Sequence, residues 1–203
     1  MHQVLKNFIV LEGLDGAGTS TQLSALGEIL KTKSREYHLS CEPSDGPIGK
    51  LIRQILKGAI TVHSDTLAYL FSADRKEHLY APEKGVLAQL NNNKMAISDR
   101  YFYSSLAYQS IKSDFDFVYE LNKDFPLPEH LFFLDISPEI GEKRLSSRDE
   151  KEIFEIPEIQ IKVRDNYYRC FERLKNAGGS IHILDGTAAI EEITLKIRNI
   201  LGL

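Results

Sequence analysis

Three glycines at positions 13, 16 and 18 follow a short apolar run and precede a helical pattern, in the segment Phe8-Ile-Val-Leu-Glu-Gly-Leu-Asp-Gly-Ala-Gly-Thr-Ser-Thr-Gln22. Glycine lets the backbone turn its N–H groups inward, and the start of the helix adds its positive dipole end, so the loop can cradle a polyphosphate. The residues expected to hold the nucleotide phosphates are Gly13, Leu14, Asp15, Gly16, Ala17, Gly18, Thr19, Ser20 and Thr21.

One position departs from the phosphate-loop pattern G-x-x-x-x-G-K-[ST]. Thr19 stands where the pattern has the lysine that reaches the β- and γ-phosphates, while Ser20 keeps the hydroxyl that binds magnesium. A glycine-rich strand-to-helix turn without a ligand therefore stays open as an alternative.

The pair Asp99-Arg100 follows another apolar run. An acid at a strand end can hold magnesium through water, and an adjacent arginine can present a two-pronged donor to a phosphate. The alternative is a buried structural ion pair.

Two sets of residues recur at helical spacing. Phe71 and Arg75 are four apart, so a helix would present an aromatic plane beside a donor group, although an isolated phenylalanine is more often part of a core. Arg100, Ser104 and Tyr108 follow at four-residue steps and could line a nucleotide along one helix face.

The string Asp99-Arg-Tyr-Phe-Tyr-Ser-Ser-Leu-Ala-Tyr-Gln109 strongly resembles the D-R-Y-x-x-S-S-x-A-Y-Q signature of thymidylate kinases. Phe8–Gln22 resembles the family's phosphate loop, Glu42–Arg53 its E-P-x-x-x-P-I-G segment, Leu70–Arg75 its L-F-x-A-D-R, and Leu134–Leu145 the stretch that leads into its lid. The resemblance implies a P-loop NTPase fold of the nucleoside monophosphate kinase type, a homodimer, and magnesium-dependent transfer of the ATP γ-phosphoryl group to dTMP.

The same resemblance implies roles for individual residues. Asp15 would lie near the acceptor sugar and the magnesium ion, with a turn or helix cap as its alternative role. The implied magnesium-site residues are Ser20, Asp99 and Asp15. In the acceptor site, Phe71 would stack on thymine, Arg75 would bind its edge, Arg100 the acceptor phosphate, Ser105 and Gln109 the base, and Tyr108 the sugar, with Glu42 and Arg53 beside them.

Glu42 has two possible roles. It could be a general base for a nucleoside hydroxyl, as in deoxyribonucleoside kinases, or the partner of an arginine. A 5′-hydroxyl must lose a proton, whereas a monophosphate oxygen at neutral pH need not, and the D-R-Y form of the third motif favours the monophosphate.

Cationic residues are missing at several family positions. Besides Thr19, Cys41 stands where many members have arginine, and the usual D-R-[FI]-E of the lid reads Glu152-Ile-Phe-Glu155. The lid segment, about 144–156, retains Arg144, Arg148 and Lys151, and we expect Arg144 and Arg148 to join Asp15 and Arg100 in catalysis. An exposed face paired with Asp149 and Glu150 is the alternative for these cations.

These residues must be positioned by a parallel sheet. Short apolar runs alternate with helical patterns, which predicts an α/β fold with helices on both faces and a site beyond the carboxyl ends of the strands. The expected strands are Phe8–Leu11, Tyr37–Cys41, Met95–Ser98, Leu131–Asp135 and Ile181–Leu184. The expected helices are Thr19–Lys31, Pro47–Leu56, Ser64–Asn91 with Pro82 as an interruption, Tyr101–Ile111, Asp116–Leu121, Ser137–Ser147 capped by Ser137, Glu158–Ala177 and Ile190–Leu201.

Composition narrows the class of protein. A length of 203 residues predicts a single kinase domain over 1–203, and the formal net charge of −4 argues against a partner such as duplex nucleic acid or an anionic membrane. Cys41 and Cys170 form no C-x-x-C motif, and no apolar stretch is long enough for a membrane span or a signal peptide, so we expect a cytoplasmic protein with reduced thiols. No histidine or calcium-loop spacing predicts a tightly held metal, and magnesium would arrive with the nucleotide.

Three hypotheses follow. The first is a thymidylate kinase that uses ATP, magnesium and dTMP. The second is a kinase for another nucleoside monophosphate or a deoxynucleoside. The third is a catalytically weakened nucleotide-binding module, because three family cations are absent together, although such a module would have little need of the acceptor-site residues in register.

Overall fold

A computed structural model describes residues 3–146 and 153–203. In these ranges the strands β1 (Val4–Gly13), β2 (Tyr37–Cys41), β3 (Met95–Asp99), β4 (Leu127–Asp135) and β5 (Ser180–Asp185) form one sheet. All neighbouring strands are parallel, in the order β2-β3-β1-β4-β5. β1 and β3 are central and neighbouring, so their carboxyl ends bring the glycine-rich loop and Asp99-Arg100 together.

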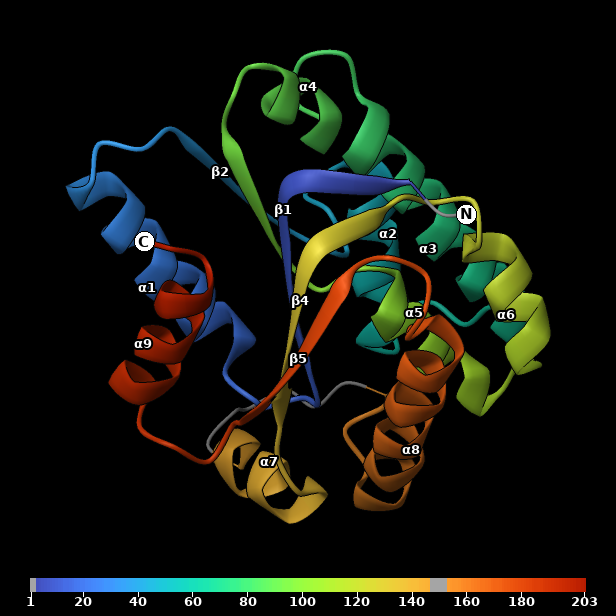
Figure 1. Cartoon of the computed structure of the whole chain (residues 1–203). Coiled ribbons are helices and arrows are strands. Elements are labelled where there is room, and N and C mark those ends of the chain that lie inside the picture. The colour runs from blue at the N-terminus through green and yellow to red at the C-terminus, as the bar shows by residue number, and fades with distance from the viewer. Residues whose placement is uncertain (1–2, 147–152) are drawn as a thin grey trace.

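Helices cover both faces of this sheet, because crossovers between parallel strands are helical. On one face α1 (Thr19–Thr32) packs beside α9 (Ile190–Ile200), and on the other α5 (Phe102–Tyr108) packs against α8 (Pro157–Leu174) (Figure 1). The remaining described helices are α2 (Pro47–Leu56), α3 (Ser64–Tyr80), α4 (Val86–Asn91), the 3₁₀ turn η1 (Gln109–Ile111), α6 (Phe115–Asn122) and α7 (Pro138–Leu145). Among the helices of the described ranges, none has the length and apolar character needed to cross a bilayer.

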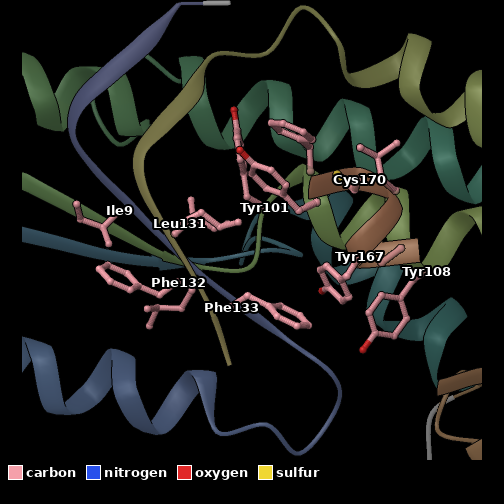
Figure 2. Packing of buried hydrophobic residues seen from close by; sticks show 14 of the residues in the cluster. Ile9, Tyr101, Tyr108, Leu131, Phe132, Phe133, Tyr167 and Cys170 are labelled. Atoms are coloured by element: carbon pink, nitrogen blue, oxygen red, sulfur yellow. The ribbon is translucent and has the colours of Figure 1, made fainter. Parts of the chain in front are cut away.

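The core is divided by the alternation of side chains along β1 and β4. Ile9 and Phe132 lie on one side of these strands, and Tyr101, Tyr167 and Cys170 lie on the other (Figure 2). On this second side, the ring of Phe133 lies 4.8 Å from that of Tyr167. A continuous aromatic cluster therefore fixes α5 and α8 to the sheet.

The predicted elements are present, and the differences lie at their ends. β4 begins at Leu127, before the predicted start at Leu131, because Leu127 and Pro128 are paired in register with Val4 and Leu5 near a β-bulge of β1. The predicted interruption near Pro82 is confirmed, since α3 ends at Tyr80 and α4 begins at Val86. The predicted N-cap at Ser137 is confirmed, with Pro138 in the first turn of α7, although the Ser137 side chain makes no capping hydrogen bond.

Candidate active site

A cleft of about 610 Å³ lies at the carboxyl ends of the strands. One part of its wall is the glycine-rich loop and the start of α1, and the opposite part comes from the residues after β2 and from α2, α3 and α5. The cleft thus has room for two ligands end to end, one on the loop and one against Phe71 and Arg75. Its wall includes the predicted residues Leu14, Asp15, Gly16, Ala17, Gly18, Thr19, Ser20, Thr21, Glu42, Arg53, Phe71, Arg75, Asp99, Arg100, Tyr108, Gln109 and Arg144.

The loop between β1 and α1 has the backbone that its glycines predict. Gly16 and Gly18 have φ angles of 82° and 96°, which side chains with a Cβ rarely adopt. A Cβ on Gly16 would also lie 2.8 Å from the carbonyl oxygen of Gly141, so α7 approaches the loop at backbone distance. Gly18 caps α1, and Thr19 begins the helix, whose first N–H groups have no intrahelical acceptors. The loop can therefore donate several N–H groups to an anion.

Ser20 and Asp99 meet at the base of this loop. The Ser20 hydroxyl donates to Oδ2 of Asp99 over 2.5 Å, while Oδ1 of Asp99 is buried and has no hydrogen-bond partner among the described residues. A hydroxyl beside a carboxylate oxygen with a free lone pair fits the oxygen ligands and bound waters that magnesium prefers. Across residues 3–146 and 153–203, no group of three His, Cys, Asp or Glu side chains forms a metal cage, so any cation here would depend on ligand oxygens.

Arg100 lies between the two parts of the cleft. Its Nη2 donates to Oδ1 of Asp15 over 2.6 Å, and its Nη1 donates to the carbonyl oxygen of Gly13 over 3.1 Å. The guanidinium also lies over the ring of Tyr108, 5.2 Å from its centroid.

The expected helix face of Arg100, Ser104 and Tyr108 needs a correction. Arg100 precedes α5 and has a φ angle of 72°, so the helix does not include it. Its Nη1 nonetheless donates to the Ser104 hydroxyl over 3.2 Å. The three side chains come together through a turn in the left-handed region instead of through helical periodicity.

Asp15 does not cap α1. Its Oδ2 accepts a hydrogen bond of 2.9 Å from Nε2 of Gln160, which also donates to the carbonyl oxygen of Phe154 over 2.9 Å. Because its other oxygen binds Arg100, Asp15 is held between Arg100 and the start of α8. It makes no described contact with Ser20 or Asp99, so a magnesium role for Asp15 stays a prediction.

Phe71 and Arg75 share one face of α3, as their spacing predicts, and both border the cleft. The Arg75 side chain is only 1% exposed, and four of the five guanidinium N–H bonds have acceptors. Nε and Nη2 donate to Glu42, Nη2 also donates to Ser105, and Nη1 donates to Asn122. One N–H of Nη1 is left for another acceptor.

Ser105 does not border the cleft. It is buried behind Arg75 and accepts a 2.9 Å hydrogen bond from Nη2 of that residue. The geometry therefore gives Ser105 an indirect role, in which it orients Arg75.

Glu42 is the partner of an arginine. Its Oε2 accepts from Nη2 of Arg75 over 2.7 Å, and its Oε1 lies 2.9 Å from Nδ1 of His78. Burial favours a higher pKa for Glu42, but Arg75 and His78 outweigh it and lower the pKa. A carboxylate held so firmly ionised by two partners is a poor acceptor for a substrate proton.

Tyr108 and Gln109 have unused polar atoms at the wall of the cleft. The Tyr108 hydroxyl and Oε1 of Gln109 are buried and have no hydrogen-bond partner among the described residues. Buried polar groups normally have partners, so both atoms fit contacts with a polar ligand.

Arg53 supports the loop after β2. It donates to the carbonyl oxygens of Pro43 and Ser44, and its Nη2 lies 3.7 Å from Sγ of Cys41. The sulfur of Cys41 thus lies against an arginine. Burial raises the pKa of the Cys41 thiol and outweighs the opposite effect of the Arg53 charge. The sulfur is therefore neutral at pH 7.

Arg144 reaches the glycine-rich loop from α7. Its Nη1 donates to the carbonyl oxygen of Gly16 over 3.2 Å, and its Nη2 donates to that of Gly186 over 3.0 Å. Arg148 and Lys151, and part of the predicted lid, lie outside the described residues. Of the expected lid cations, Arg144 is the one whose position can be given.

Several site residues were missed by the sequence reasoning. These residues lie behind the side chains that border the cleft and hold them or their backbone by hydrogen bonds. They are Glu12, His78, Asn122, Gln160 and Tyr167. Only Glu12 had a sequence signal, since a carboxylate inside an apolar strand needs partners when buried. The others come from helices with no local motif.

The chain is similar to known proteins over most of its length. A family model described as thymidylate kinase matches residues 11–197. A protein of Methanococcus aeolicus named "Probable thymidylate kinase" is 39% identical over 95% of this chain and 94% of its own length. Proteins with the same name from Thermococcus onnurineus and Thermococcus kodakarensis are 40% and 43% identical, over 92% and 81% of this chain and 92% and 84% of their own lengths.

Proposed function

We propose roles for the residues of the cleft from the premise that this chain belongs to the thymidylate kinase family and phosphorylates dTMP. The acceptor nucleotide would lie against Phe71 and Arg75, with its phosphate on Arg100. Arg75 keeps one N–H for an oxygen of the thymine edge, and Phe71 offers its ring as a stacking surface. The Tyr108 hydroxyl and Oε1 of Gln109, which belong to residues at the wall of the cleft, would bind the sugar and the base.

The donor would be ATP, with its phosphates on the N–H groups of the loop from Gly13 to Thr21. Ser20 and Asp99 would hold magnesium, partly through water, because Asp99 keeps a buried oxygen with no described partner. When bound, magnesium supplies positive charge at the donor phosphate oxygens during transfer.

No residue is needed to remove a proton from the acceptor. A monophosphate is already ionised at neutral pH, and Glu42 is occupied by Arg75 and His78. The protein would act by aligning the two phosphates and by excluding water, as is general in phosphoryl transfer. This argues against the alternative acceptor, a nucleoside hydroxyl.

Thr19 leaves a gap in the donor site, and we propose that a lid cation fills it. Arg144 already contacts the carbonyl oxygens of the phosphate loop, so a change of side-chain conformation could bring it to the donor phosphates. Arg148 and Lys151 are further candidates from the sequence.

A homodimer and a cytoplasmic location are also part of this proposal. The dimer rests on family membership alone, and analytical ultracentrifugation of the purified chain tests it. The location rests on Cys41 and Cys170, both of which are free thiols.

The observation that carries the proposal is the position of Arg100, which lies between the phosphate loop and the Phe71–Arg75 face. A coupled ADP-release assay with ATP, magnesium and a panel of nucleosides and monophosphates tests it. We expect dTMP to be the best acceptor, dUMP weaker, and ribonucleotides or purine monophosphates much weaker. Faster turnover of thymidine or of a purine monophosphate would refute the acceptor assignment.

A further inference from the structure

Glu12 is a fully buried carboxylate that touches neither part of the cleft. It is the residue before Gly13, and its side chain alternates with its neighbours on β1 so that it lies on the α5 and α8 side of the sheet. The residues that border the cleft do not include it. Glu12 therefore cannot contact a nucleotide directly.

The carboxylate binds two elements that surround Arg100. Oε1 accepts from the backbone N–H of Tyr101 over 2.8 Å and of Ser104 over 3.2 Å. Oε2 accepts from the Ser104 hydroxyl over 2.5 Å and from the Tyr167 hydroxyl over 2.8 Å. Figure 2 shows Tyr101 and Tyr167 on the same side of β1. One side chain thus fixes the start of α5 and the middle of α8.

The two hydroxyls that bind Glu12 also bind Arg100. They lie 2.8 Å from each other, so Ser104, Tyr167 and Oε2 of Glu12 form a triangle that contains both hydroxyl protons. Ser104 and Tyr167 can then only accept from Arg100, whose Nη1 lies 3.2 and 3.4 Å from them. Their lone pairs orient Nη1, and Nη2 is directed to Asp15 at the cleft.

The backbone at Arg100 needs such support. A φ angle of 72° is unfavourable for a residue that has a Cβ, and it persists only where the surroundings enforce it. The N–H of Tyr101, the next residue along the chain, is held by Glu12. The carbonyl oxygen of Arg100 accepts from the Ser98 hydroxyl over 2.7 Å on the preceding side.

Other charged and titratable groups near Glu12 come from the same elements. Arg100 is the nearby cation, and the Tyr167 hydroxyl binds the carboxylate from α8. Besides burial, the charge of Glu12 raises the pKa of Tyr103 on α5 and of Cys170 on α8. Burial and the charge of Glu12 raise the pKa of the Tyr167 hydroxyl and of the Cys170 thiol, so both stay neutral. The one charged partner of Glu12 among these groups is Arg100.

We propose that Glu12 is a positioning residue for the acceptor phosphate. Through Tyr101, Ser104 and Tyr167, it holds the Arg100 guanidinium at the cleft in the orientation that receives the phosphate of dTMP. This inference rests on the proposed role of Arg100, and it assigns to Glu12 no contact with either nucleotide.

A double-mutant cycle at pH 8 tests the inference on the full-length protein. Glu12→Gln keeps the size of the side chain but removes the charge and one acceptor, so we expect the KM for dTMP to rise roughly tenfold. The KM for ATP should stay within about twofold, because the Glu12 side chain binds Tyr101, Ser104 and Tyr167 and makes no described hydrogen bond to the phosphate loop. In an Arg100→Ala background, Glu12→Gln should change the KM for dTMP less than about twofold.

Asp135→Asn is the matched control. Asp135 also lies at the carboxyl end of a strand and binds an arginine and a tyrosine of α8, over 2.7 Å to Arg164 and 2.8 Å to Tyr168, but it does not border the cleft. We expect it to leave the KM for dTMP unchanged. If Glu12→Gln does not fold, Tyr167→Phe removes one of the two hydroxyls that Glu12 orients, and it should raise the KM for dTMP a few fold only when Arg100 is present.

The outcomes separate the two proposals. An unchanged KM for dTMP in Arg100→Ala would refute the proposed role of Arg100 itself. A strong effect of Arg100→Ala with no effect of Glu12→Gln would refute only the positioning role. The same holds if Glu12→Gln acts equally with and without Arg100, or raises the KM for ATP as much as that for dTMP, because the effect would then be a general loss of structure.

Discussion

The free energy of unfolding of the Glu12→Gln variant, measured relative to that of the wild type, should increase as the pH rises. Burial raises the pKa of Glu12 from its ordinary value of 4.5 to about 7, although Arg100 and the hydrogen bonds from Ser104, Tyr167 and Tyr101 oppose the shift. Between these two values the unfolded chain loses the proton while the folded chain keeps it. The free energy of unfolding of the wild type therefore falls as the pH rises through this window.

The size of the effect follows from the shift. Each pKa unit is worth 1.36 kcal/mol, so the shift of Glu12 from 4.5 to about 7 corresponds to about 3 kcal/mol in total, of which roughly 2–3 kcal/mol falls between pH 5 and pH 8. Glutamine does not titrate, so the stability of the variant lacks this contribution to the pH dependence. Other titrating groups are common to both proteins and cancel in the difference. Urea unfolding of both proteins at pH 5, 6, 7 and 8 measures this difference in the free energy of unfolding.

Asp135→Asn is the control for the sign of the effect. Burial favours a higher pKa for Asp135, but hydrogen bonds from Arg164 and Tyr168 outweigh it and lower the pKa below its ordinary 3.8. The stability that this group contributes is present above pH 3.8 and is lost only in more acidic solution. The difference between wild type and Asp135→Asn should therefore be constant from pH 5 to pH 8. A difference between wild type and Glu12→Gln that is also constant over this range would show that Glu12 ionises normally, and the reasoning from its burial would be wrong.

Four further predictions concern the cleft. Arg100→Ala should raise the KM for dTMP by a factor that corresponds to about 1.5–3 kcal/mol, the loss of a charge-assisted contact, and unchanged kinetics with a sharply lower Tm would indicate a structural ion pair instead. Phe71→Ala should raise the KM for dTMP about tenfold and leave that for ATP unchanged, since stacking is worth about 0.5–1.5 kcal/mol beyond the apolar area lost; an equal rise in both would exclude a thymine platform. Glu42→Gln should lower the Tm by roughly 10 °C because it leaves Arg75 buried without its counter-charge, and a stable variant that has lost only kcat would restore the general-base role. Thr19→Lys should raise kcat by less than about tenfold if a lid cation compensates, whereas a gain nearer to 10²–10³, the worth of one transition-state donor, would show that nothing does.

The sequence by itself determined the sheet and the location of the cleft. Apolar runs of strand length between helical patterns can be buried only as a parallel sheet, and glycines at 13, 16 and 18 permit the backbone that Gly16 and Gly18 adopt. Many of the polar residues that border the cleft were also found from local signals, because they follow a strand or recur at helical spacing. Phe71 and Arg75 are the clearest case.

Only the tertiary structure decided which polar groups hold these residues in place. Arg100 reaches Ser104 and Tyr108 because its backbone adopts a positive φ angle. The sequence does not predict this conformation, since an arginine rarely adopts it. Glu12 binds Tyr167, a residue 155 positions later in the chain, and Glu42 binds Arg75 across 33 positions. The physical reason is that a buried polar group needs a hydrogen-bond partner, and the packing of strands and helices can supply one from a distant part of the sequence. The local sequence does not show which distant residue that will be.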